Sequence, residues 1–313
     1  MRKIVFLDAE TLGKVDGMEA YSQFGEFIAY DYTPAEQIIE RIADAEIIIT
    51  NSAKISREII EASPKLRLIC IAATGMNIID LEAAKEHNVA VKNVAGYSTD
   101  SVTQVTFAMA LELMQHTRFY NDFSREGYIN AQCYRHKMPA FNEIAGKRWG
   151  VIGLGNIGRN VAKVAQAFGA EVVYYSTSGK NDNPNYQRLS LEQLMSSCDI
   201  ISIHAPLNDQ TRNLIDYDKL SLMKKSAIII NLGRGGIINE SALQQALDNE
   251  IISGAGIDVF TQEPIVAENP LLKVKNPERL VLAPHIGWTS VEARNKIVGM
   301  IANNIKTWIE QNN

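Results

Sequence analysis

A glycine-rich turn in the middle of the chain constrains the fold most. Residues 153–158 read Gly-Leu-Gly-Asn-Ile-Gly, follow an apolar segment at 149–152 and open a stretch of helical composition. In a strand-to-helix turn of this spacing the first glycine permits the tight bend, the second lets the backbone approach a pyrophosphate, and the third lets helix and strand pack closely. Amides at the start of the helix face the anion. The residues expected to hold a dinucleotide here are Gly153, Gly155, Asn156, Ile157 and Gly158.

Short apolar segments alternate with helical ones on both sides of this turn, which is typical of parallel sheets covered by helices. The strands expected before it are 3–8, 45–50, 67–73 and 89–92, with helices such as 35–43 and 81–86. The strands expected from the turn onward, which would form a six-stranded sheet, are 149–153, 171–176, 200–204, 227–231, 254–258 and 280–283.

Two further stretches complete the organisation. Residues 99–118 are continuously compatible with a helix, and 119–147 are aromatic and polar without clear periodicity, so we expect a connecting helix followed by an arm. Residues 290–311 have the apolar spacing of an amphipathic helix. A chain of 313 residues exceeds the usual single-core size. We therefore expect an α/β protein with two Rossmann-like or flavodoxin-like doubly wound parallel-sheet domains.

Composition narrows the possible partners. A net charge of -5 and a pI near 5.7 argue against a nucleic-acid partner, which requires a basic surface. The sequence contains no apolar run of the roughly 20 residues that span a bilayer, so no membrane association is expected. Cys70, Cys133 and Cys198 are odd in number and lack CxxC spacing, so neither a metal site nor a disulfide framework is expected. A cytoplasmic location fits these cysteines best.

The strand at 171–176 ends where an acidic residue would usually bind the adenosine ribose hydroxyls. This chain has Ser176 and Thr177 there, followed by Ser178. Their hydroxyls suit either a ribose or a 2′-phosphate, and Lys180 adds a charge that favours the phosphate. Asp182 is close enough in sequence to bind the ribose instead. The cofactor is therefore NAD or NADP, with the preference left open.

Three segments follow apolar strands of the second series, at the sheet edge where open α/β proteins bind ligands. They are 231–236, 258–264 and 284–288. His285 suits proton transfer near neutral pH, Glu263 would stabilise and orient its imidazolium, and Arg234 matches a carboxylate. Each residue alone is as well explained by a surface ion pair or a satisfied loop side chain. Their occurrence at successive strand ends after a dinucleotide turn favours reduction of a 2-oxo acid.

The motifs at 153–158, 231–236, 258–264 and 284–287, in this order, resemble those of the D-2-hydroxyacid dehydrogenase family. The resemblance covers nearly the whole chain and includes residues 73–80, which match the family's substrate loop. It implies that residues 1–98 plus 286–313 form a substrate-binding domain. It also implies that residues 99–285 form an inserted dinucleotide-binding Rossmann domain.

The resemblance also implies residue roles. Arg234 binds substrate, Glu263 and His285 form the acid/base pair, and Asp258 contacts the nicotinamide carboxamide. Further residues implied to line the cofactor site are Thr103, His204, Ala205, Pro206, Leu232, Gly233 and Gly287. Residues implied to bind substrate, besides Arg234 and His285, are Thr74, Gly75, Met76, Asn77 and Trp288, although Trp288 fits simple aromatic packing equally well.

Within the family, residues 93–99 and 285–288 look most like the glycerate dehydrogenase, or hydroxypyruvate reductase, branch. The expected activity is NAD(P)-dependent interconversion of a small D-2-hydroxy acid and its 2-oxo acid, either D-glycerate and hydroxypyruvate or glycolate and glyoxylate. Two alternatives remain: a dinucleotide-sensing interaction protein of the corepressor type, and a phosphoglycerate dehydrogenase. Relatives pair through the segment that corresponds to 119–141, so we expect a homodimer.

Overall fold

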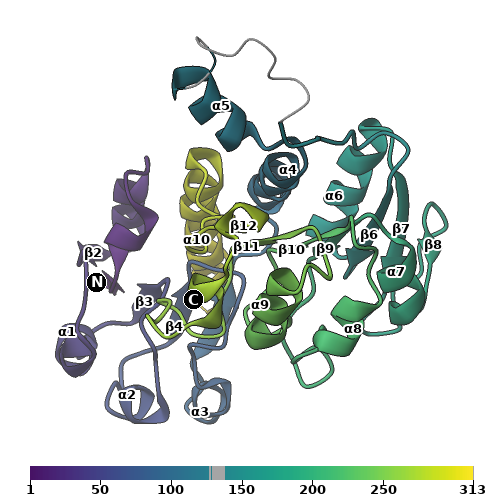
Figure 1. Ribbon diagram of the computed structural model, residues 1–313. Coiled ribbons are helices and arrows are strands. Elements are labelled where there is room, and N and C mark those ends of the chain that lie inside the picture. The colour runs from purple at the N-terminus through teal and green to yellow at the C-terminus, as the bar shows by residue number, and fades with distance from the viewer. Residues whose placement is uncertain (127, 129–137, 313) are drawn as a thin grey trace. The chain divides into compact units, whose positions relative to one another are not determined.

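The chain folds into two compact units, each with its own parallel sheet (Figure 1). The computed structural model describes residues 1–126, 128 and 138–312. Unit 1 comprises Met1–Ser98 and Trp288–Asn313, and unit 2 comprises Thr99–Gly287. The chain thus passes into unit 2 after Ser98 and leaves it after Gly287, two residues later than the boundary expected from the sequence. Cys133 and part of the expected arm lie outside the described residues.

Unit 1 contains a five-stranded parallel sheet in the order β2-β1-β3-β4-β5. The strands are β1 (Lys3–Phe6), β2 (Glu26–Ala29), β3 (Ile47–Thr50), β4 (Leu68–Ile71) and β5 (Ala90–Asn93). The sequence prediction missed β2, which lies at the sheet edge and has no fully buried side chain. By contrast, β3 and β4 are buried along their whole length, which is why their apolar runs were recognisable.

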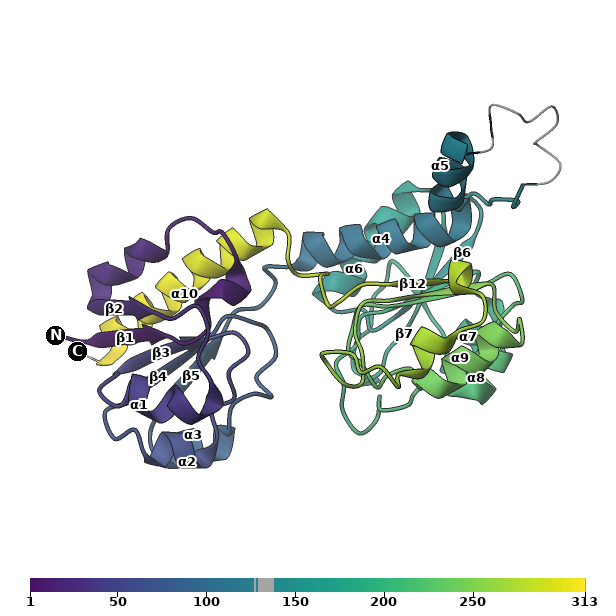
Figure 2. The ribbon, with the colours of Figure 1, turned by 60° about the vertical axis from the view of Figure 1, so that its left-hand side comes forward.

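Helices cover both faces of the unit 1 sheet, as Figure 2 shows. One face packs against α1 (Ile38–Ile42), α2 (Arg57–Glu61) and α3 (Leu81–Glu86), with η3 (Ala35–Gln37) leading into α1. The other face packs against η1 (Ala9–Leu12), η2 (Met18–Phe24) and the C-terminal helix α10 (Val291–Asn312). The last helix of the chain therefore completes the core of the first unit.

Unit 2 contains a seven-stranded parallel sheet in the order β12-β11-β10-β9-β6-β7-β8. The strands are β6 (Arg148–Ile152), β7 (Glu171–Tyr175), β8 (Gln187–Arg188), β9 (Ile200–Ile203), β10 (Ile228–Asn231), β11 (Gly254–Ile257) and β12 (Leu280–Leu282). The expectation of six strands was wrong because β8 has only two residues, both exposed, and no apolar pattern marks it. It pairs with β7 so that Arg188 is opposite Tyr174.

The helices of unit 2 also form two layers. One layer has α4 (Thr99–Gln115) and α6 (Asn156–Ala167); the other has α7 (Leu191–Ser197), α8 (Tyr217–Ser221) and α9 (Glu240–Asp248). Short η5 (Pro270–Lys273) and η6 (Pro277–Arg279) precede β12. The prediction of one helix over 99–118 was wrong. His116 adopts a left-handed φ of 53° that ends α4, and α5 (Thr117–Glu126) then occupies the start of the expected arm.

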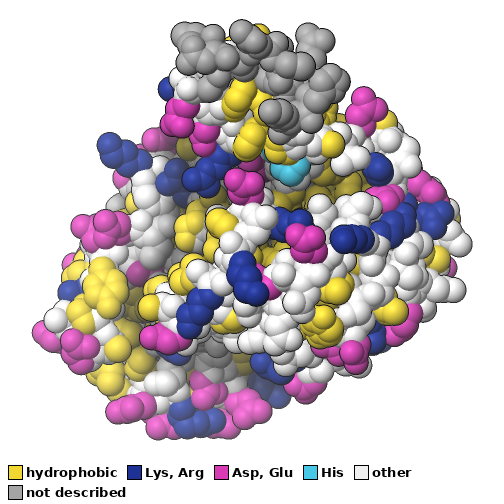
Figure 3. Space-filling model, in the orientation of Figure 1, with side chains coloured by type: hydrophobic (Ala, Val, Ile, Leu, Met, Phe, Trp, Pro, Cys, Tyr) yellow, Lys and Arg dark blue, Asp and Glu magenta, His cyan; other side chains and the backbone are white. Residues whose placement is uncertain are grey.

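Charged side chains of both signs are interspersed over the described part of the face shown in Figure 3. None of the helices in the described residues is both long enough and apolar enough to cross a membrane. Among the same residues, no cluster of three or more His, Cys, Asp or Glu side chains is arranged to hold a metal ion. Because both sheets are parallel, the loops that follow the strands gather at one edge of each sheet, where the expected site residues lie.

Candidate active site

The glycine turn has the backbone geometry that its sequence predicts. Gly153 adopts a φ of 91°, a conformation that L side chains rarely adopt, and a Cβ on Gly158 would lie 2.2 Å from the carbonyl oxygen of Gly153. Gly155 is the N-cap residue of α6, so no side chain caps the first amides of this helix. A Cβ built on Gly155 meets no atom within 4 Å. The free amides of α6 and this open space suit a pyrophosphate, which needs both donors and close backbone approach. Asn156 is exposed and Ile157 half-buried at the same helix start.

His204 and Ala205 lie directly against this turn. A Cβ on Gly153 would come within 2.9 Å of the Ala205 backbone and 3.0 Å of the His204 carbonyl carbon. His204 as a whole is half-buried, yet both of its ring nitrogens are buried and without a hydrogen-bond partner in the described structure. Burial lowers the pKa of this imidazole to about 3, so it is neutral. An orphaned donor and acceptor beside the turn fit a polar ligand such as a dinucleotide.

The loop after β7 is already ordered by its own hydrogen bonds. Ser176 is buried, and its Oγ accepts from the Asn181 amide at 3.3 Å, whereas Thr177 is half-buried. Arg188 was not expected from the sequence: from β8 its guanidinium donates to the Gly179 carbonyl at 3.0 Å. It has no carboxylate partner among the described residues. A cation therefore lies against the loop that follows β7.

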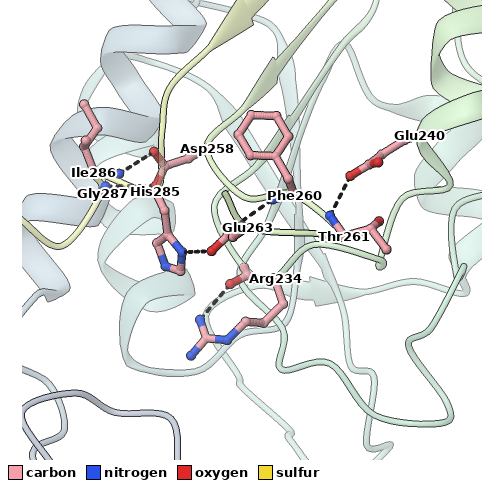
Figure 4. Close-up of polar contacts among 10 residues, drawn as sticks. Arg234, Glu240, Asp258, Phe260, Thr261, Glu263, His285, Ile286 and Gly287 are labelled. Carbon is pink, nitrogen blue, oxygen red and sulfur yellow. Dashed lines mark hydrogen bonds and ion pairs between the residues drawn. The ribbon is translucent and has the colours of Figure 1, made fainter. Parts of the chain in front are cut away.

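The structure brings His285 and Glu263 together at the edge of unit 2 (Figure 4). The distance between His285 Nδ1 and Glu263 Oε2 is 2.7 Å, and the other carboxylate oxygen accepts from the Phe260 amide at 2.9 Å. Burial alone would raise the pKa of Glu263. The hydrogen bonds from His285 and Phe260, together with the charges of His285 and Arg234, outweigh burial and lower it. The pair therefore has an ionised carboxylate next to an imidazole.

Asp258 fixes the backbone that presents His285. Its carboxylate accepts from the amides of Ile286 and Gly287, each at 2.8 Å, and its carbonyl accepts from the His285 amide at 2.7 Å. His285 has a left-handed φ of 57°, a strained conformation for a residue with a side chain. A Cβ on Gly287 would lie 2.8 Å from Asp258 Oδ2. Burial raises the pKa of Asp258 despite the two amides.

Arg234 follows β10 in a tightly packed glycine segment. A Cβ on Gly233 would lie 2.8 Å from the Ala205 carbonyl oxygen, and one on Gly235 would lie 1.8 Å from the Phe260 carbonyl oxygen. The half-buried Arg234 donates to the Gly233 carbonyl at 2.9 Å and contributes to lowering the pKa of Glu263 (Figure 4). Arg234 and His285 thus both lower the pKa of the Glu263 carboxyl group.

The other residues expected around the cofactor lie in the same unit. Thr103 is buried in α4, where its hydroxyl donates to the Thr99 carbonyl and accepts from Asn160. Leu232 is buried, with a methyl carbon 3.2 Å from the Cβ position of Gly287. Pro206 is exposed after β9. Leu232 thus follows β10, Pro206 follows β9, and Thr103 is hydrogen-bonded to α6.

The residues expected to bind substrate from unit 1 follow β4. Thr74, Met76 and Asn77 are exposed and Gly75 is half-buried; the Thr74 hydroxyl donates to the Val94 carbonyl at 3.0 Å. Trp288 packs edge-to-face on Tyr97 with ring centroids 6.4 Å apart, as the packing interpretation expected. At the same sheet edge Asp8 is buried and saturated with hydrogen bonds, which the sequence prediction missed.

Comparison with known proteins identifies the family. The model of the D-isomer specific 2-hydroxyacid dehydrogenase NAD-binding domain matches residues 107–287, which lie within unit 2. A hydroxypyruvate reductase from Blautia hydrogenotrophica is 36% identical, covering 98% of this chain and 97% of that protein. A glycerate dehydrogenase from Methylorubrum extorquens is 34% identical, covering 98% and 96%. The solved structure of an acyclic imino acid reductase with NADPH and D-Arg has a TM-score of 0.86 at 30% identity, covering 99% and 97%.

The chain therefore belongs to the D-isomer specific 2-hydroxyacid dehydrogenase family. It is an oxidoreductase that uses NAD or NADP to interconvert a small D-2-hydroxy acid and the corresponding 2-oxo acid.

Replacing Gly155 with alanine tests the glycine turn. Its φ of -78° tolerates a side chain and no protein atom obstructs a Cβ, so Gly155→Ala should fold with an unchanged melting temperature. The added methyl would occupy the space that a pyrophosphate needs, and we expect dinucleotide affinity, measured by calorimetry, to fall roughly tenfold or more. The matched control is Gly299→Ala in α10, where a Cβ also meets nothing. Equal affinities in Gly155→Ala and the control would contradict this assignment.

Proposed function

We propose that this protein reduces a small 2-oxo acid, with hydroxypyruvate as its main substrate, and that His285 donates the proton. The observation that carries this proposal is the 2.7 Å contact between His285 Nδ1 and Glu263 Oε2. When bound, the nicotinamide supplies the hydride. The imidazole supplies the proton that the carbonyl oxygen needs, and general acid catalysis by a histidine suits near-neutral pH.

Glu263 determines which imidazole nitrogen is available. An ionised carboxylate only accepts hydrogen bonds, so it holds the proton on Nδ1 and leaves Nε2 to carry the transferable proton. The carboxylate also stabilises the imidazolium, the form that donates. The positive charge of Arg234 helps to lower the pKa of Glu263. Its planar guanidinium presents a fork of donors for the carboxylate of the 2-oxo acid substrate and polarises the adjacent carbonyl.

The first of two observations favours a three-carbon hydroxy acid, and the second indicates residues that could bind its carboxylate. Relatives that match nearly the full length of the chain carry the names hydroxypyruvate reductase and glycerate dehydrogenase. The loop Thr74 to Asn77 is exposed at the carboxyl edge of unit 1 and contains the small residue Gly75, so its amides can approach a carboxylate. In this proposal unit 2 holds the dinucleotide, the acid/base pair and Arg234.

Substitution of His285 tests the proton donor. His285→Ala should lower kcat for hydroxypyruvate by about 10²- to 10⁴-fold, because the carbonyl oxygen loses its acid, while dinucleotide affinity stays within twofold. Glu263→Gln should also lower kcat, by a smaller factor, since the imidazole keeps its place but loses the charge that stabilises its protonated form. Steady-state rates and equilibrium binding are measured on the same preparations.

A matched control for these variants is His87→Ala. His87 pairs with a glutamate on the surface of unit 1, with Nε2 3.9 Å from Glu61 Oε1, and should leave kcat unchanged. If His285→Ala kept the wild-type kcat, the proposed acid role of His285 would be wrong.

We further propose that NADP is the preferred cofactor. Ser176, and not an acidic residue, directly follows β7 at the position that usually binds the two ribose hydroxyls, and Ser176 is buried there. Arg188, held against the loop by the Gly179 carbonyl, and the exposed Lys180 supply positive charge for a 2′-phosphate. Arg188 has no carboxylate partner within the described residues, so its charge remains available. A charge-assisted bond to phosphate is stronger than one to a neutral ribose hydroxyl.

Arg188→Ala separates the two cofactors. We expect the affinity for NADP⁺, and for the fragment 2′,5′-ADP, to fall roughly 10- to 100-fold, because a hydrogen bond to a charged group is lost. The affinity for NAD⁺ should not change. Arg67→Ala is the control, since Arg67 is also exposed and donates only to backbone carbonyls. Equal losses for NAD⁺ and NADP⁺, or tighter binding of NAD⁺ by the unmodified protein, would overturn this preference.

We also propose that the protein is a cytoplasmic homodimer. Helix α5 carries Phe119 and Phe123 in stacked contact, and Phe141 is 62% exposed. A second copy of the chain would cover these aromatic side chains. Cys70 and Cys198 are free and buried, as is usual in a reducing compartment. Light scattering at micromolar concentration should give twice the chain mass, and the mass of one chain would contradict the dimer.

A further inference from the structure

The buried carboxylate of Asp8 accepts hydrogen bonds from three consecutive backbone amides. It follows β1 and is 2% exposed. Its Oδ1 accepts from the Asn51 amide at 2.8 Å, and its Oδ2 accepts from the amides of Ser52 at 2.7 Å and Ala53 at 2.9 Å. The hydroxyls of Ser52 and Thr50 donate to the same Oδ2 at 2.9 and 3.1 Å. These five donors compensate the burial of the charge, so the loop after β3 is fixed to the end of β1.

The side chain of Asn51 is fixed at the same time. Its Nδ2 donates to the Ala72 carbonyl at 2.8 Å, and because a carbonyl can only accept, this contact determines which end of the carboxamide is nitrogen. The opposite end, Oδ1, has no hydrogen-bond partner among the described residues. Asn51 is half-buried. Two hydrogen bonds therefore determine the position of the acceptor Oδ1. Asp8 binds the backbone amide of Asn51, and the Ala72 carbonyl binds its side-chain Nδ2.

This acceptor lies beside the proposed substrate loop. The strands β3 and β4 are parallel neighbours in register, with Thr50 opposite Ile71. Asn51 and Ala72 are the residues that follow each of them, and Ala72 is two positions before Thr74. The Asn51 carboxamide is consequently anchored to the chain segment that leads into the Thr74 to Asn77 loop, at the same edge of unit 1.

We infer that Asn51 is a specificity-determining residue whose Oδ1 accepts a hydrogen bond from the 3-hydroxyl of hydroxypyruvate, and that Asp8 is its positioning residue. This inference rests on the proposed function. Hydroxypyruvate carries a hydroxyl donor next to its carbonyl, whereas pyruvate and glyoxylate carry none. Binding pyruvate would desolvate Oδ1 without giving it a partner, and a site built around a substrate hydroxyl rejects analogues that lack it.

The test compares kcat/KM for hydroxypyruvate and pyruvate in variants of the full chain. For the unmodified protein we expect a preference for hydroxypyruvate of roughly tenfold or more. Asn51→Leu, which keeps a similar volume without the acceptor, should reduce that ratio roughly tenfold through loss of hydroxypyruvate activity alone. Ser56→Ala is the control: Ser56 is exposed in the segment between β3 and α2, its side chain makes no capping hydrogen bond to α2, and the ratio should stay within twofold.

Asp8→Asn tests the positioning role, since an amide nitrogen would face the backbone donors and loosen the loop. It should lower the same ratio while leaving NADP⁺ affinity, a property of unit 2, unchanged. If Asp8→Asn fails to fold, Asn51→Leu still tests the role of Asn51. The Asn51 side chain is half-exposed, so its replacement should leave the fold intact. An unchanged ratio in Asn51→Leu, or no preference for hydroxypyruvate in the unmodified protein, would overturn the inference. Absence of activity on every 2-oxo acid would instead contradict the proposed function itself.

Discussion

In each unit a buried carboxylate accepts hydrogen bonds from backbone amides of a neighbouring loop. The conformation of the loops at both sheet edges depends on this interaction. In unit 2, Asp258 binds the amides of Ile286 and Gly287 and so holds His285 in a left-handed conformation that it would not adopt alone. In unit 1, Asp8 does the same for the loop after β3. Each unit therefore orders its own strand-end loops before any ligand arrives, which lowers the entropic cost of binding.

The two carboxylates next to His285 have different environments and different effects. Burial raises the pKa of Asp258, whose oxygens are occupied by backbone amides. The hydrogen bond from His285 helps to lower the pKa of Glu263, which is less buried and faces the imidazole. When different environments shift the pKa values of two nearby carboxyl groups apart, the two groups can serve different functions, one structural and one chemical. Here Asp258 shapes the backbone and Glu263 orients the ring.

The sequence predicted the features that depend on local pattern. Buried strands such as β3 and β4, and the glycine turn at 153–158, follow from apolar runs and from the steric demands of a tight bend. It did not predict β8, whose two exposed residues have no apolar pattern. Nor did it predict the left-handed conformation of His116, which divides the expected helix into α4 and α5. The role of Asp8 was also inaccessible, because its main partners are backbone amides, which every residue type except proline can supply.

The protein transfers a hydride from a reduced nicotinamide to a small 2-oxo acid and so produces the D enantiomer. The most direct measurement incubates the purified protein with NADPH and hydroxypyruvate, follows the near-ultraviolet absorbance of the reduced nicotinamide, and determines the chirality of the glycerate formed. We expect one dinucleotide to be oxidised for each D-glycerate produced, with no L-glycerate. Formation of L-glycerate or a racemate, or no oxidation of NADPH or NADH with any small 2-oxo acid, would contradict this activity.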